Sequence, residues 1–86
     1  MKTLKILSWE SPHTPLKNEN DWPRKGFEIR LRKCVTSEKS VLKRLLKGIT
    51  NKELVEIPIN TKINEEILSL ADHLTMHGAK FEITDN

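Results

Sequence analysis

The stretch from Asn64 to Gly78 constrains the fold of this 86-residue chain more than any other. Asn64 can cap a helix, and Glu65 and Glu66 fall in the first turn, where the helix dipole favours acidic side chains. Gly78 follows as a C-terminal stop. Apolar residues recur between these ends at the spacing of one helix face: Ile67, Leu70, Ala71 and Leu74. The pattern predicts an amphipathic helix whose stripe faces the core.

Other periodic segments surround this helix. Alternating apolar and polar residues predict strands at 3–9, 27–35, 53–59 and 80–84. A second helix is predicted after a cap at Thr36 or Ser37, because its apolar residues return at helical spacing: Val41, Leu42, Leu45, Leu46 and Ile49. The three prolines and the Asn and Asp residues of segment 10–26 predict a long loop.

These segments predict one α+β domain over residues 1–86, in the order β, loop, β, α, β, α, β. Residues 1–9 form an N-terminal strand, residues 10–26 the loop and residues 27–84 a compact βαβαβ core. Two helices are expected to pack on one face of a three- or four-stranded sheet.

The sequence also indicates a compartment. A single cysteine, Cys34, favours a reducing environment, and no run approaches the ~18 apolar residues of a membrane span. The N-terminal apolar run is too short for a secretory signal. We therefore expect a cytoplasmic protein that does not enter membranes.

Charge is distributed unevenly along the chain. The formal net charge is only +3. Residues 26–52 carry eight basic and two acidic side chains, whereas residues 53–86 carry two basic and seven acidic side chains. A bipolar molecule of this kind can orient in the field of a charged partner.

The basic residues of the middle segment are the candidate binding site. Lys39, Lys43, Arg44 and Lys47 lie on the side of the predicted helix opposite its leucines, and Arg30 and Arg32 lie on the outer face of the predicted strand. Three interpretations remain open: a solvated face, a docking surface for an acidic protein, or a contact for nucleic-acid phosphates. The low aromatic content disfavours nucleic acid, because few rings are left to stack on bases.

Trp22 and Arg24 extend this candidate site. An exposed Trp beside Arg is typical of an interface hot spot, although Trp9 and Trp22 can instead cover the edge of the core. The predicted partner-binding residues are thus Lys39, Lys43, Arg44, Lys47, Arg30, Arg32, Trp22 and Arg24.

Catalytic chemistry is poorly supported by the sequence. His73 and His77 have a metal-chelating spacing but no convincing third ligand, and Cys34 has no histidine placed near it. A metal-independent ribonuclease using His13 with His73 or His77 is the remaining enzymatic alternative. We expect no cofactor, no metal and no enzymatic activity.

A family resemblance covers residues 27–84. Glu65 and Glu66 opening a helix, Leu70 and Leu74 in phase, and the closing "HGAKFEI" resemble the C-terminal domain of the large-subunit ribosomal stalk protein. Val41, Leu42, Lys43 and Leu45 fit the Val-Ile-Lys-x-Val pattern of its basic helix. The resemblance implies that a first strand leads to this helix, and that the helix, with Lys43, docks on translation GTPases.

The function expected from the sequence is a small non-catalytic regulatory or adaptor protein. It binds an acidic protein surface through its basic helix, and it is part of, or inhibits, a larger machine such as the translation apparatus. The alternative is a nucleic-acid-binding protein that contacts phosphates through the same face.

Overall fold

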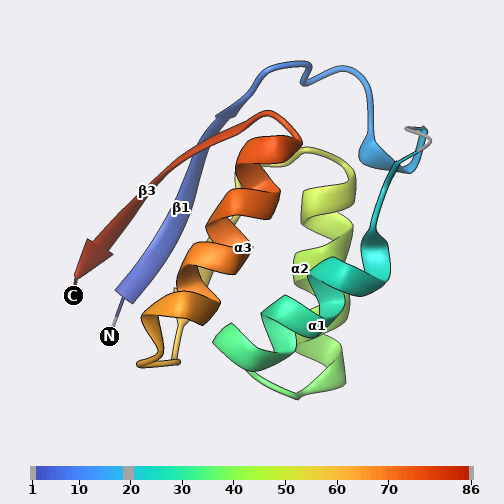
Figure 1. Ribbon diagram of the computed structural model, residues 1–86. Coiled ribbons are helices and arrows are strands. Elements are labelled where there is room, and N and C mark those ends of the chain that lie inside the picture. Colours follow the sequence, from blue (N-terminus) through green and yellow to red (C-terminus); the bar gives the residue numbers. More distant parts are fainter. Residues whose placement is uncertain (1, 19–20, 86) are drawn as a thin grey trace.

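A computed structural model describes residues 2–18 and 21–85 of the chain (Figure 1). Two residues of the predicted loop, Glu19 and Asn20, lie outside the described residues. The elements follow one another as β1 (Lys2–Trp9), the 3-10 helix η1 (Leu16–Asn18), α1 (Arg24–Cys34), α2 (Lys39–Thr50), β2 (Glu56–Ile59), α3 (Asn64–Met76) and β3 (Ala79–Asp85). The α+β class predicted from the sequence is confirmed.

The described strands form one antiparallel sheet in the order β2-β1-β3, with the N-terminal strand in the centre. Leu4 of β1 lies opposite Ile57 of β2 and Ile83 of β3. An irregularity in the pairing with β3 falls between Ile6 and Ser8. The central place of β1 makes the start of the chain part of the core.

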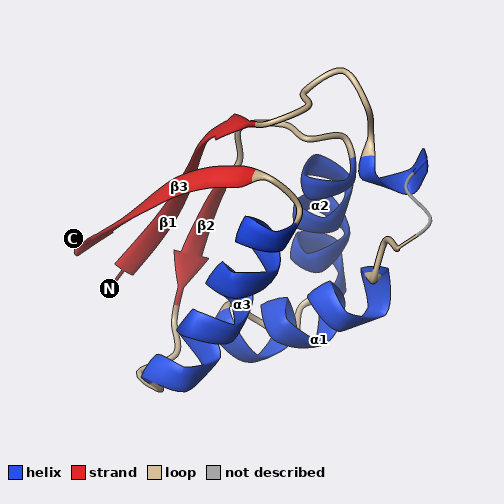
Figure 2. Cartoon of the chain, turned by 45° about the horizontal axis from the view of Figure 1, so that its top comes forward, coloured by secondary structure: helices blue, strands red, loops and turns tan. Residues whose placement is uncertain are grey.

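The helices α1, α2 and α3 lie on one side of this sheet, where α1 crosses the other two and packs mainly on α3 and α2 (Figure 2). Leu4 and Ile6 are fully buried, whereas Lys5 between them is exposed on the opposite face. Phe27 of α1 and Leu70 of α3 are also fully buried. Burying such a side chain contributes about 1.5–3 kcal/mol, so this layer between sheet and helices holds the fold together.

The main correction to the sequence-based order is the segment that contains Phe27. It was predicted as a strand, but it forms helix α1. Phe27 and Leu31 are four residues apart, and this spacing places them on one face of a strand and also on one face of a helix. Ile29 distinguishes the two, because a strand would bury it beside Phe27 and the helix leaves it 51% exposed. The first strand that the family resemblance implied at this place is therefore absent.

The chain between β1 and α1 is tied to the rest of the molecule. Leu16 in η1 is fully buried, and the Trp9 Nε1–H donates to the carbonyl of Glu53 at 2.9 Å. The Lys52 ammonium, itself buried, donates to the carbonyl of Ser11 at 3.2 Å. Because α1 begins at Arg24, the connection is also shorter than the predicted 10–26 loop.

Helices α2 and α3 form where the sequence predicts them, but their N-caps are Glu38 and Ile63 instead of the predicted Thr36 or Ser37 and Asn64. Leu42, Leu45, Leu46 and Ile49 are the buried leucine and isoleucine positions of α2. Gly78 follows α3 with φ of 85°, a left-handed conformation that glycine adopts without strain. The fold thus places α2, with its basic residues, beside α1.

Candidate functional site

The basic side of α2 faces solvent. Lys39, Lys43 and Lys47 recur every four residues along the helix and are all exposed. Each like-charged pair at this spacing destabilises the helix by a few tenths of a kcal/mol. The burial of the leucines on the opposite side offsets that cost.

Helix α1 brings a second set of cations to the same place. A hollow of about 370 Å³ lies between α1 and α2. Its α1 wall and its α2 wall supply charged and apolar side chains: Arg24, Lys25, Glu28, Arg32, Lys39, Leu42, Lys43 and Leu46. The assignment of residues 24–34 to a helix is what places Arg24 and Arg32 beside α2.

An adjoining hollow of about 380 Å³ continues toward the C-terminal end of α2 and reaches η1. It is lined by Lys17, Arg24, Lys43, Lys47, Thr50 and Asn51. Arg24 and Lys43 line both hollows. We call the two hollows together the basic groove, and its cations are Lys17, Arg24, Lys25, Arg32, Lys39, Lys43 and Lys47.

One carboxylate, Glu28, lines this groove among the described residues. Its Oε1 lies 3.2 Å from an Arg32 nitrogen, one helical turn along α1. Both side chains are well exposed, and such a surface pair is worth at most about 1 kcal/mol. The acidic residues of segment 53–86 line neither hollow, so most of the positive charge stays unpaired within the described part of the chain.

Two arginines of the predicted site lie outside the basic groove. Arg30 points toward α3, where its Nε–H donates to Ser69 Oγ at 2.9 Å, and it also donates to the carbonyl of Gly26. The sequence predicted Arg30 on the same strand face as Arg32, but in the helix α1 the two side chains point in different directions. Arg44 is exposed on α2 but lines neither hollow.

Trp22 packs on the core and lines neither hollow of the basic groove. Its ring is half-buried, 4.9 Å from the Phe27 ring, and it meets the His77 ring edge-on at 5.7 Å. Trp9 is 6% exposed and hydrogen-bonded. Both tryptophans therefore cover the core, as one of the two interpretations of the sequence expected.

The histidines and the cysteine also serve packing. His73 stacks edge-on against Phe27, with 5.6 Å between ring centroids, and His77 lies 5.7 Å from Phe27. The Cys34 thiol is buried and donates to the carbonyl of Glu66 at 3.3 Å. Burial, and to a lesser degree Glu66, raises the pKa of this thiol. Within residues 2–18 and 21–85, no group of three or more potential metal ligands converges.

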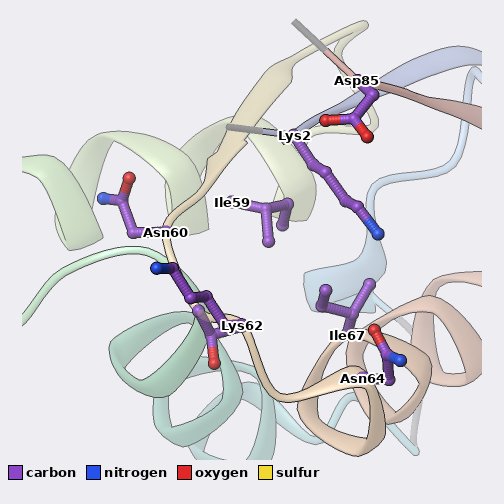
Figure 3. A pocket seen from close by; sticks show the side chains of 8 residues that line it. Lys2, Ile59, Asn60, Lys62, Asn64, Ile67 and Asp85 are labelled. Carbon is purple, nitrogen blue, oxygen red and sulfur yellow. The ribbon is translucent and has the colours of Figure 1, made fainter.

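Two features of the surface were missed by the sequence interpretation. Lys17 and Lys25 join the basic groove from segments that had been assigned to a loop. A separate hollow of about 400 Å³ lies between the end of the sheet and the start of α3, where Lys2 extends past Ile59 toward Ile67 (Figure 3). Its lining mixes both charges and polar side chains: Lys2, Ile59, Asn60, Thr61, Lys62, Asn64, Ile67 and Asp85.

Comparisons with known proteins give no relative: the chain matches no family model, no curated protein and no solved structure. The helices of the described residues are all too short or too polar to cross a membrane. We therefore infer the function from the geometry of the basic groove.

Proposed function

We propose that this protein is a non-catalytic regulatory or adaptor module that docks on an acidic surface of another protein through its basic groove. One observation carries the proposal: cations from η1, α1 and α2 converge on a groove in which Glu28 is the one carboxylate among the described residues. Separate segments of the chain contribute to this concentration of charge, and a complementary partner would relieve their repulsion.

The chemistry of the remaining candidate groups supports binding over catalysis. His73 and His77 are packed against aromatic rings, and the Cys34 thiol is buried with a raised pKa, which disfavours the nucleophilic thiolate. These side chains suit a stable core better than a reaction centre.

An acidic protein fits the groove better than a nucleic acid does. Among the described residues, those lining the two hollows include no aromatic side chain, and both tryptophans are engaged in the core. Proteins that bind single strands usually add stacked rings to their cationic surface. A carboxylate-bearing partner needs only the cations that the groove provides.

Helix α1 replaces the first strand that the resemblance to the ribosomal stalk domain implies. Residues 41–83 still resemble that domain, and this shorter resemblance makes the translation apparatus the first place to search for a partner. Lys43, the residue matched to the basic helix of that family, is at the centre of the groove. The single reduced Cys34 is consistent with the cytoplasm as the site of action.

A pull-down from nuclease-treated and untreated lysate tests this function. We expect the wild-type protein to retain the same acidic protein in both samples, and the Lys43→Glu variant to lose it. Capture that disappears after nuclease treatment would instead identify a nucleic-acid-binding protein. Capture that the Lys43→Glu variant retains would remove the basic groove as the docking site.

A further inference from the structure

We propose that the occupant of the basic groove is a linear acidic segment of the partner, lying along α2 from Lys39 to Lys47. This inference rests on the proposed function and narrows it, because it excludes an acidic patch on a folded surface as the main contact. Three features support this proposal: the arrangement of the two hollows, the residues that line them, and the Glu28–Arg32 ion pair inside the groove.

The two hollows of the basic groove follow one another along α2. They adjoin at Arg24 and Lys43, and they lead in opposite directions along α2. One hollow contains Arg32 and Lys39, and the other contains Lys17 and Lys47. A chain laid along the groove meets cations of α2 on one side, and on the other it meets cations of α1 in the first hollow and Arg24 with Lys17 of η1 in the second. A convex folded surface reaches mainly the rims.

The dimensions suit a short segment. Lys39 and Lys47 are about 12 Å apart along the helix axis, at 1.5 Å per residue. An extended chain covers this distance with about four residues, at roughly 3.3 Å each. Extra residues at each end would reach Arg32 and Lys17, so a segment of about eight residues fills the groove.

The floor of the groove differs between its two halves. Leu42 and Leu46 line the hollow between α1 and α2, whereas Thr50 and Asn51 line the hollow near η1. Leu42 and Leu46 are each only 3% exposed, so they offer little apolar contact, and the preferred segment is defined by carboxylates that meet the cations of both hollows.

Glu28 competes with the segment for the groove. Its carboxylate already pairs with Arg32, 3.2 Å away, and its negative charge repels a carboxylate of the segment that approaches the same arginine. Removal of the Glu28 charge should therefore strengthen binding, whereas removal of a distant acidic charge such as Glu56, exposed on β2, should change it much less.

Fluorescence anisotropy with the full chain tests the inference. The probes are a labelled glutamate-rich peptide of about eight residues, a peptide of half that length, a small folded acidic protein, and a single-stranded oligonucleotide of equal charge. We expect the longer peptide to bind about tenfold or more tightly than the shorter one. Glu28→Gln should raise its affinity about threefold, and Glu56→Gln, the matched control, should change it by less than about 1.5-fold.

The alternative outcomes are distinct. If the folded acidic protein binds in a manner that depends on Lys43 and the peptides do not, the linear segment is wrong and the proposed function stands. If only the oligonucleotide binds, both proposals fail. Equal affinity of the two peptides, or no gain from Glu28→Gln, would likewise contradict a segment lying along the whole groove.

Discussion

Arg24 of α1 and Lys43 of α2 line the same two hollows, although they are far apart in the sequence. Their convergence follows from the way α1 packs across α2, and it places two cations in the middle of the basic groove. The repulsion between groove cations has a consequence for stability as well as for binding.

We expect Lys43→Glu to stabilise the isolated protein while it weakens partner binding. The glutamate would replace repulsion from Lys39 and Lys47, one turn away on each side, with attraction, and each pair contributes about 0.2–0.5 kcal/mol. Because repulsion is lost and attraction gained in both pairs, urea unfolding at low salt should show a gain of about 1–2 kcal/mol that shrinks in 1 M salt. A loss of stability would show that Lys43 has a structural role.

The helical assignment of α1 is tested by two glutamine substitutions, two residues apart. Ile29→Gln should change the free energy of unfolding by less than about 0.5 kcal/mol, because this side chain is 51% exposed. Leu31→Gln should cost about 3 kcal/mol or more, because Leu31 is fully buried. Equal losses in urea unfolding would support the strand predicted from the sequence, which buries both.

The same two residues explain why part of the fold could not be predicted from the sequence. In α2 and α3 the buried residues include adjacent pairs, Leu45 with Leu46 and Leu70 with Ala71, which a strand would point to opposite faces and a helix keeps on one side. Both helices were predicted close to their observed bounds. In α1 the apolar residues Phe27, Ile29 and Leu31 satisfy the strand period just as well. Packing of this segment against α3 selects the helix over the strand, and the local periodicity of the sequence does not encode that contact.

Much the same limit applies to the basic groove. The exposed row of Lys39, Lys43 and Lys47 was predictable, because the opposite face of α2 is strongly apolar. The contributions of Lys17 and Lys25 were not, because they depend on how η1 and α1 pack beside α2. The orientation of Arg30 toward Ser69 depends on the helical path of α1 in the same way.

The raised pKa of the Cys34 thiol predicts a loss of stability at alkaline pH. Above the ordinary thiol pKa of 9.0, the unfolded chain releases this proton while the folded protein retains it, so the free energy of unfolding should fall as the pH rises further. Urea unfolding between pH 7 and pH 10 measures the effect. Cys34→Ala should show a smaller decline than the wild type, and identical slopes would contradict the burial of a protonated thiol.

The central claim, that a defined groove rather than diffuse positive charge binds the partner, is tested most directly by comparing Lys43→Glu with Arg44→Glu. The two residues are neighbours on α2, both are exposed, and both substitutions change the charge equally, but only Lys43 lines the groove. The measurement is the affinity of each variant for a labelled acidic peptide in about 0.1 M salt, where charges beyond about 10 Å are screened. The account predicts a loss of about tenfold or more for Lys43→Glu and of less than about threefold for Arg44→Glu, whereas equal losses would contradict it.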